Sequence, residues 1–477
     1  MNKILMLQPL YIYKRWPVPH DFMAMITHTP TLAFAQLRSI LKSYQVDYID
    51  GTVEKMSLKE LTKRVMAADI IFINTHSSIG AFNAEANLRH ILDVCPDKPI
   101  IMGGHHATAY DFQWLGRGAH FVVRNEGEET IVELIKAIEN NGPYDKIKGI
   151  SWRDSEHQFH RNDSRPLISN LDDLPLPDWS IFNRELYDVP LAAPGYSTVV
   201  ETSRGCPHRC KFCAAAEMWS HTQRFKSAER ILEELRVLSS MGVGNLFFAD
   251  DNFGAEPARY EKVYKGILKE GMEFNFGAFM RADVIAKSPE TVRLARKAGL
   301  RLVSLGIESS IPRILEDCNK ALDFEQSKKA VEILRSEGIF IAGFFMIGYM
   351  GQTQEETDIT FKIAREMSDY PIISIFEPRC GTEDFSRATK SGDLPSGDMF
   401  YHNTINFINS QAHIRAQNNA FHRRYLFHME QFRKLLFGTP TQKKWFRTVY
   451  WNLTKSVLSG RLQDLYHPWE MVRNLYK

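Results

Sequence analysis

The chain has 477 residues, more than a single hydrophobic core usually supports, so two or three domains are expected. Hydrophobic residues make up 44% and charged residues 24%, which is ordinary globular usage and excludes a disordered or fibrous protein. The formal net charge is +2, which gives no reason to expect a nucleic-acid partner.

The first 145 residues alternate short apolar runs with longer amphipathic stretches. Helical patterns such as Thr31–Tyr44 separate the apolar runs. The predicted strands are Lys3–Gln8, Val46–Ile49, Ile70–Asn74, Pro99–Met102 and Phe121–Val123. Because strands that alternate with helices form a parallel sheet, residues 1–145 are predicted to be a Rossmann-like domain. A Pro- and Asp-rich stretch, Leu171–Asp178, marks a linker that we assign to residues 146–194.

Strand–helix alternation resumes over residues 195–385 with a longer period. The predicted strands are Ser197–Thr202, Asn245–Ala249, Glu273–Phe279, Leu302–Gly306, Ile339–Ile347 and Ile372–Phe376. Strand–helix units of about 35 residues suit a partial (β/α)6 barrel, an α/β fold whose reactive face is the carboxyl end of the strands.

Residues 386–477 are helical in pattern, aromatic and basic. Two interpretations stay open: a basic amphipathic helix that contacts a membrane surface, or a helical cap that packs its aromatic side chains on the barrel. The aromatic and apolar side chains concerned are Trp445, Phe446, Tyr450, Trp451, Leu453, Leu458, Leu465, Tyr466 and Trp469.

The cysteines and the N-terminus bear on the cellular compartment. Three of the six cysteines fall within eight residues, unlike the dispersed cysteines of a disulfide scaffold. The apolar stretch at the N-terminus is too short for a secretory signal, and no window has the length of a membrane-spanning helix. We therefore expect a cytoplasmic protein, with membrane association only through the C-terminal region.

A cysteine-rich loop lies between the first predicted barrel strand and a helix. Residues 201–213 read Glu-Thr-Ser-Arg-Gly-Cys-Pro-His-Arg-Cys-Lys-Phe-Cys, and Gly205 and Pro207 keep the loop from becoming helical. Three thiolates, from Cys206, Cys210 and Cys213, can bind three irons of a [4Fe-4S] cubane and leave the fourth iron open. A structural zinc ion would instead need a fourth ligand, a role that His208 or His221 could fill.

This cysteine spacing in a strand-to-helix loop resembles the radical S-adenosylmethionine (SAM) superfamily, and the resemblance covers residues 195–385. It implies that the open iron binds SAM and that the reduced cluster cleaves SAM to a 5′-deoxyadenosyl radical. An external electron donor of the flavodoxin or ferredoxin type is then required. By the same resemblance, Phe212 is expected beside the adenine.

Further candidates for binding SAM follow the predicted strands. Asp250 and Asp251 end the second strand, Arg281 follows the third and Glu308 ends the fourth. Carboxylates at strand ends can accept hydrogen bonds from a ribose or an ammonium group, and the family pattern favours Glu308 over the two aspartates. Gly348, after the fifth strand, would let the backbone approach the adenine. A helix cap or a turn is the alternative role at each position.

The residues expected to face the substrate give a less specific prediction than those expected to bind SAM. Cys380 replaces a proline that is common in related enzymes, and it is either linked to the substrate or a small core residue. Apolar side chains near the expected barrel mouth favour a lipid-like or tetrapyrrole substrate unless they pack in the core. These side chains are Phe344, Phe345, Met346, Tyr349 and Met350.

A glycine pair in the first domain extends the resemblance. Gly103 and Gly104 follow a predicted strand, where a bulky planar ligand can come against the backbone. Together with residues 124–130 and the cysteine loop, the pair resembles the cobalamin-dependent radical SAM family, which includes methylases of unactivated carbon and the anaerobic magnesium-protoporphyrin ester cyclase. The Asp-x-His-x-x-Gly motif that supplies a cobalt ligand in some cobalamin proteins is absent, and this branch commonly works without it.

The resemblance implies a methyltransferase that uses SAM and cobalamin to methylate an unactivated carbon of a natural product, a lipid or a tetrapyrrole. Two alternatives stay open. One is a radical cyclisation or rearrangement without net methylation, and the other is a non-catalytic cobalamin- or metal-binding module.

Overall fold

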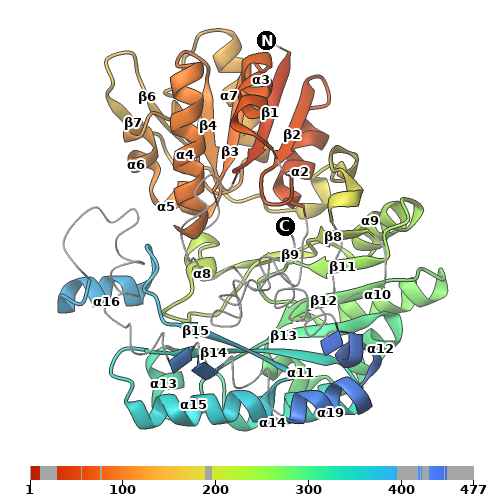
Figure 1. Ribbon diagram of the computed structural model, residues 1–477. Helices are drawn as coiled ribbons and strands as arrows, with labels where there is room; N and C mark the ends of the chain where they lie inside the picture. The colour runs from red at the N-terminus through yellow and green to blue at the C-terminus, as the bar shows by residue number, and fades with distance from the viewer. Residues whose placement is uncertain are drawn as a thin grey trace. The chain divides into compact units, whose positions relative to one another are not determined.

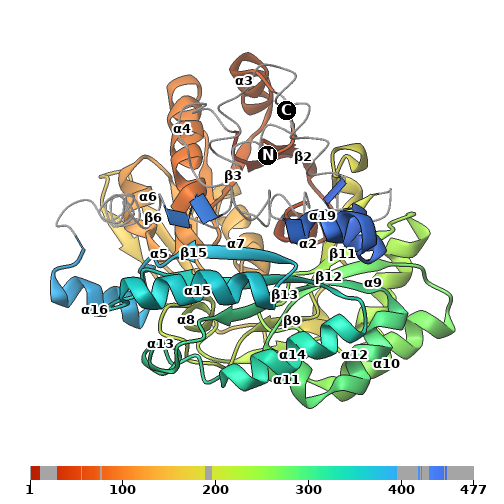
Figure 2. The ribbon, with the colours of Figure 1, turned by 60° about the horizontal axis from the view of Figure 1, so that its bottom comes forward.

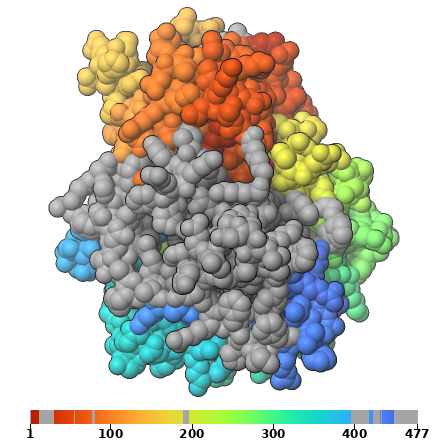
Figure 3. Space-filling view, viewed as in Figure 1, coloured from red at the N-terminus to blue at the C-terminus, as the bar shows by residue number. Residues whose placement is uncertain are grey.

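The computed structural model describes residues 2–10, 30–54, 56–75, 78–187, 196–394, 417–418, 420–421, 429–444 and 446–447, which are coloured in Figure 3. The described residues divide into two compact units. Those up to Leu186 form the first unit, and those from Tyr187 onward form the second.

The first unit is built on one seven-stranded sheet of order β2-β1-β3-β4-β5-β6-β7 (Figure 1). The strands from β1 to β5 pair in parallel, whereas β6 and β7 join as antiparallel neighbours. The strands are β1 (Lys3–Gln8), β2 (Gln45–Asp50), β3 (Ile70–Asn74), β4 (Ile100–Gly103), β5 (Phe121–Val123), β6 (Ile150–Arg153) and β7 (Phe159–Arg161). The predicted Rossmann-like arrangement is therefore present, with polar strand ends at its carboxyl edge.

The helices of the first unit fill the connections between its strands. They are α2 (Leu32–Ile40), α3 (Leu58–Ala67), α4 (Ser78–Val94), α5 (His105–Ala109), α6 (Asp111–Gly116) and α7 (Glu128–Glu139). Three 3-10 turns follow, at Leu171–Asp173, Trp179–Ile181 and Arg184–Leu186. The serine at position 57 caps α3 by accepting a hydrogen bond from the Glu60 amide, as expected of an N-cap residue.

The segment that we assigned to a linker begins with the β6–β7 hairpin, so the first unit extends beyond residue 145. Arg161 of β7 forms an ion pair with the buried carboxylate of Asp111, which also accepts a hydrogen bond from Ser151 of β6. These strands have four and three residues and carry polar side chains, so they lack the apolar run by which the other strands were predicted.

The second unit holds a six-stranded sheet of order β15-β14-β13-β12-β11-β8, in which every pair is parallel. Its strands are β8 (Ser197–Val200), β11 (Asn245–Phe248), β12 (Asn275–Met280), β13 (Leu300–Glu308), β14 (Phe340–Ile347) and β15 (Tyr370–Ile375). Neither β8 nor β15 pairs with a further described strand, so the barrel is partial. All six predicted strands are confirmed, with boundaries shifted by a few residues.

Helices line one side of this sheet, as Figure 2 shows for α12, α14 and α15. The helices of the barrel are α9 (Ala228–Ser240), α10 (Pro257–Lys269), α11 (Ala282–Lys287), α12 (Pro289–Ala298), α13 (Pro312–Asp317), α14 (Phe324–Ser336), α15 (Gln354–Met367) and α16 (Glu383–Ser391). Both α14 and α15 begin with a capping box, at Asp323 and Thr353 respectively. The strands thus expose their carboxyl ends at one edge of the sheet, where the loops converge.

The described C-terminal residues pack on the barrel. Helix α19 (Met429–Phe437) is followed by Gln442, which donates a hydrogen bond of 2.6 Å to Asp369. Phe421 stacks on Phe361 of α15, and the Phe446 side chain is fully buried. For these residues the helical-cap interpretation fits, whereas the other side chains named for this region lie outside the described residues. Among the described helices, none is long and apolar enough to span a membrane.

Candidate functional site

The cysteine loop leaves the barrel through a turn that requires glycine. After β8 the chain forms β9 (Ser203–Gly205), which pairs antiparallel with β10 (Gln223–Phe225), and the loop ends at α8 (Ala214–Met218). Gly205 has a φ of +94°, and a Cβ there would lie 2.2 Å from the Thr222 carbonyl oxygen. Only glycine fits this turn, which confirms that Gly205 keeps the loop from becoming helical.

The three thiols fit a [4Fe-4S] cluster. Cys206, Cys210 and Cys213 are partly buried, are not in disulfides and interact electrostatically with one another. Burial raises the pKa of Cys206 to about 11, and the charges of the other two cysteines add to this shift. Cluster binding therefore displaces protons from the loop, because only thiolates ligate iron.

The zinc alternative receives no support from the geometry. Among the described residues, no three His, Cys, Asp or Glu side chains converge as the ligands of a single metal ion would. A cubane does not need that convergence, because each thiolate binds a different iron. His221, a candidate fourth zinc ligand, instead lies 3.5 Å from the Glu217 carboxylate.

Two other segments hold the loop on either side of Cys210. The Lys211 amide donates to the Cys318 carbonyl at 3.0 Å, and the Lys211 carbonyl accepts from the Asp384 amide at 3.1 Å. The side chain of Asn319 donates a hydrogen bond of 2.8 Å to the Arg209 carbonyl. The loop backbone is thus fixed by the turn after α13 and by the start of α16.

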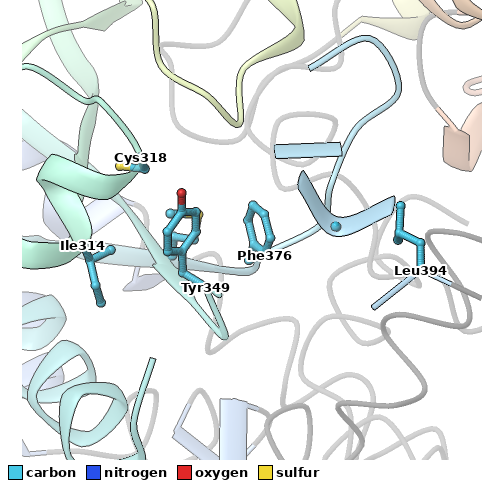
Figure 4. Close-up of a cluster of buried hydrophobic side chains, with 7 residues drawn as sticks. Ile314, Cys318, Tyr349, Phe376 and Leu394 are labelled. Atoms are coloured by element: carbon cyan, nitrogen blue, oxygen red, sulfur yellow. The ribbon is translucent and has the colours of Figure 1, made fainter. Parts of the chain in front are cut away.

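A core cluster beneath the loop contains Cys318, Tyr349 and Phe376. Figure 4 shows the Tyr349 ring between the other two side chains, and its ring centroid is 4.8 Å from that of Phe376. The Tyr349 hydroxyl donates to the buried carboxylate of Asp384 at 3.1 Å, and Phe212 packs against the cluster.

This packing confirms, for three of the apolar side chains named near the barrel mouth, the alternative that they pack in the core. Phe345, Met346 and Tyr349 are buried, and the last two belong to the core cluster. They therefore give no information about the substrate class.

Glu308 occupies an unusual backbone position at the end of β13. The register between β13 and β14 shifts between Gly306 and Glu308, and Glu308 has a φ of +65°. Such a φ is rare for a residue with a side chain and is often found at binding sites, where the surrounding structure enforces it. The Glu308 carboxylate forms an ion pair of 2.8 Å with Lys320, and both side chains are largely buried.

Asp250 has a structural role, and the structure argues against the predicted contact with SAM. Its carboxylate is fully buried and accepts hydrogen bonds from the Thr202 amide at 2.7 Å, the Ser203 hydroxyl at 2.8 Å and the Tyr260 hydroxyl at 2.9 Å. The Thr202 hydroxyl also donates to it. Because these donors occupy its oxygens, Asp250 ties the end of β11 to the end of β8.

The neighbouring Asp251 differs from Asp250 in its exposure to solvent. Its side chain is exposed to solvent, yet the surrounding protein desolvates it and raises its pKa to about 6, with Asp250 and Glu201 contributing. The Gly205 amide and the Trp219 side chain donate hydrogen bonds to its carboxylate, which lower the pKa in part. Unlike Asp250, Asp251 is reached by solvent, so a contact with SAM stays a prediction for Asp251.

Arg281 and Gly348 shape the backbone around the strand ends. The Arg281 guanidinium is buried, pairs with Asp283 at 2.9 Å and donates to the Lys320 and Ala321 carbonyls at 3.3 and 3.2 Å. Gly348 has a φ of +73°, and its amide donates to the Gln352 side chain at 2.5 Å. Both positions therefore have structural roles, and a contact with SAM stays a prediction for each.

In the first unit, Gly103 and Gly104 at the carboxyl end of β4 differ in the space that a side chain would have. A Cβ on Gly104, whose φ is +100°, would lie 2.5 Å from the Thr75 carbonyl oxygen, so only glycine fits. A Cβ on Gly103 would meet no atom of the described residues within 4 Å. No described residue therefore fills the space beside Gly103 at the end of β4, which fits the approach of a planar ligand such as cobalamin.

Comparison with known proteins identifies the second unit. Residues 200–364 match the family model of the radical SAM superfamily. These residues form a radical SAM domain. A radical SAM domain implies a [4Fe-4S] cluster, SAM and a reductant, so the cofactor prediction for this domain and the prediction of an enzyme are confirmed.

The radical SAM domain and the unit before it have similar counterparts in other proteins. An uncharacterised methyltransferase of Pyrococcus horikoshii is 28% identical, over 82% of this chain and 85% of that protein. The anaerobic magnesium-protoporphyrin IX monomethyl ester cyclase of Cereibacter sphaeroides is 25% identical, over 81% and 68%. The cobalamin-dependent radical SAM enzyme OxsB, solved with aqua-cobalamin and SAM, matches with a TM-score of 0.68 at 16% identity, over 100% of this chain and 80% of that chain. This likeness confirms the α/β fold with its parallel sheets.

Sequence reasoning missed two residues that the structure places at the radical SAM site. Lys320 pairs with Glu308, and Asn319 holds the Arg209 carbonyl. Both lie on the turn after α13, more than ten residues from Glu308 and far from the cysteines in sequence. No periodicity or motif marks this turn, so its role becomes visible only in the folded chain.

Proposed function

We propose that this radical SAM enzyme transfers a methyl group to an unactivated carbon and that its first unit binds cobalamin. The observation that carries the proposal is the open space at Gly103, at the carboxyl edge of a Rossmann-like sheet on the same chain as a radical SAM domain. The relative from Pyrococcus horikoshii is named a methyltransferase, which favours methyl transfer over the alternatives.

Residues of this chain would bind the cluster, SAM and a further ligand group. When bound, the cluster and SAM supply a 5′-deoxyadenosyl radical, and cobalamin supplies the methyl group. Cys206, Cys210 and Cys213 hold the cluster and leave one iron open to SAM. Glu308 accepts a hydrogen bond from the SAM ammonium group, and Asp251 accepts one from a hydroxyl group of a bound ligand.

The proposed substrate is a small molecule with an unactivated carbon, from the natural-product, lipid or tetrapyrrole classes. The proposed electron donor is a small acidic protein of the flavodoxin or ferredoxin type. A peripheral membrane contact through the C-terminal region belongs to the same proposal, because a lipid substrate would be reached there.

The nucleosides released from SAM test the reaction class. Anaerobic incubation with reductant, cobalamin, SAM and a metabolite extract is expected to give S-adenosylhomocysteine and 5′-deoxyadenosine together, because methyl transfer and hydrogen abstraction each consume SAM. Liquid chromatography with mass spectrometry measures both, and the product gains the mass of one methylene group. Deoxyadenosine alone, with a product that gains no methylene group, would instead favour the ester-cyclase type of reaction.

The two glycines of the first unit allow a test of cobalamin binding. We expect Gly103→Leu to reduce retained cobalamin at least tenfold, as measured by absorbance, because the new side chain fills the space where the ligand lies. The melting temperature of the variant is measured beside it, so that loss of cobalamin from a folded protein is distinguished from unfolding; a Cβ at this position meets no described atom within 4 Å.

The matched control is Gly244→Leu, at a glycine of the second unit that also has open space for a Cβ. This variant should retain cobalamin as the unmodified protein does. Equal cobalamin retention by Gly103→Leu and the unmodified protein would rule out this edge as the binding site.

A further inference from the structure

Lys320 places a buried positive charge between the cluster loop and the strand end that carries Glu308. Its side chain is 9% exposed, and its ammonium nitrogen lies 2.8 Å from a Glu308 carboxylate oxygen. The same nitrogen lies 5.8 Å from the centre of the Phe212 ring, one residue before Cys213, and it interacts electrostatically with the Cys210 thiol.

The backbone that carries Lys320 is held on several sides. The Lys320 amide donates to the Leu315 carbonyl at 2.9 Å, and its carbonyl accepts from Arg281 at 3.3 Å. The residues on either side, Asn319 and Ala321, have φ values of +51° and +48°. Such a turn persists only where surrounding contacts enforce it, so the position of the ammonium group is fixed by the fold.

The ammonium group keeps its charge in this environment. Burial by itself lowers the pKa of Lys320, but the pKa is raised overall, and the Glu308 carboxylate 2.8 Å away contributes to this rise. Lys320 is therefore a permanent cation at neutral pH.

We propose that Lys320 is a positioning residue with two partners: it orients the Glu308 carboxylate at the SAM site, and its charge raises the reduction potential of the cluster. This inference rests on the proposed binding of the cluster by the three cysteines and of SAM by Glu308. On reduction the cluster gains one electron from the donor, so its net charge becomes more negative by one. A fixed cation 5.8 Å from the Phe212 ring of the cysteine loop stabilises the reduced form more than the oxidised form, whereas the Glu308 carboxylate has the opposite effect.

Because Lys320 and Glu308 carry opposite charges, their variants should shift the reduction potential of the cluster in opposite directions. The reduction potential of the anaerobically reconstituted cluster is measured without SAM, by titration with dithionite followed by electron paramagnetic resonance. Lys320→Met is expected to lower the ratio of reduced to oxidised cluster at a fixed potential about tenfold, which is a shift of about 59 mV for a one-electron couple. Glu308→Gln is expected to raise it, and the double variant should return close to the unmodified protein.

Two further variants separate charge from structure. Lys320→Arg keeps the cation and should keep the potential. Lys328→Met removes a lysine of α14 that pairs at the surface with Glu325, and it should also leave the potential unchanged. If Lys320→Met lost its cluster on purification, Lys320→Gln would carry the test instead, and an unchanged potential in that variant would overturn the role of Lys320.

The outcomes distinguish this inference from the proposed function. Shifts of the same sign in Lys320→Met and Glu308→Gln, or no shift in either, would overturn the role of Lys320 while leaving the radical SAM chemistry intact. Failure of the unmodified protein to take up a cluster at all would overturn both.

Discussion

Replacing Cys206, Cys210 and Cys213 together by alanine is expected to abolish both iron binding and SAM cleavage. The loop offers three thiols to three irons, and the described residues around it provide no other group of metal-binding side chains. Loss of all three should reduce bound iron and 5′-deoxyadenosine formation to background, at least a thousandfold below the unmodified protein. Iron analysis and chromatography of the nucleosides measure the two effects.

The matched control is Cys95→Ser, which changes a partly buried thiol in the first unit. It should retain the full cluster. The triple variant should also keep its far-ultraviolet circular dichroism, because the three side chains are only partly buried and do not belong to the hydrophobic core. Retention of stoichiometric iron and of SAM cleavage in the triple variant would contradict the assignment and favour a non-catalytic module.

Asp250→Ala is expected to destabilise the protein by about 3 kcal/mol or more, because it leaves buried donors without an acceptor. The Thr202 amide and the hydroxyls of Ser203 and Tyr260 all donate to this carboxylate. Each unsatisfied donor in a buried position costs about 1–3 kcal/mol. Denaturant unfolding of the purified protein measures the change.

The adjacent residue supplies the control. Asp251→Ala should cost less stability than Asp250→Ala does, because solvent reaches this side chain and can replace it at its two donors, the Gly205 amide and the Trp219 side chain. The two variants should also differ in ligand binding: Asp251→Ala is expected to weaken the binding of SAM, whereas Asp250→Ala acts through stability. A stable Asp250→Ala variant that fails to bind SAM would restore the original assignment of Asp250 as a contact.

The barrel and the Rossmann-like sheet were predictable because their strands are buried on both faces. The predicted bounds of β1, β3 and β5 agree with the structure, since each strand is a nearly continuous apolar run. The β6–β7 hairpin and the antiparallel pair β9–β10 were missed because their strands have three or four residues with polar side chains. Such strands form through pairing with their neighbours, which sequence periodicity does not record.

The site was predictable only where residue type and spacing carry the chemistry. The three cysteines are such a case, and Glu308 could be placed at a strand end because the barrel topology was clear. By contrast, Asp250 and Asp251 have the same chemistry in the sequence, and only the fold shows that one is buried and the other exposed. Lys320 reaches Glu308 through a turn whose geometry depends on contacts distant in sequence.

The transfer of a labelled methyl group tests the central claim most directly. The anaerobically reconstituted protein is incubated with reductant, cobalamin, SAM that carries a trideuterated methyl group, and a metabolite extract from cells that lack the gene. The account predicts that a product acquires the labelled methyl group as 5′-deoxyadenosine accumulates, and that the triple cysteine variant gives neither. Deoxyadenosine formation with the label only in SAM and in the methionine released by its cleavage, and in no other extract metabolite, would contradict it.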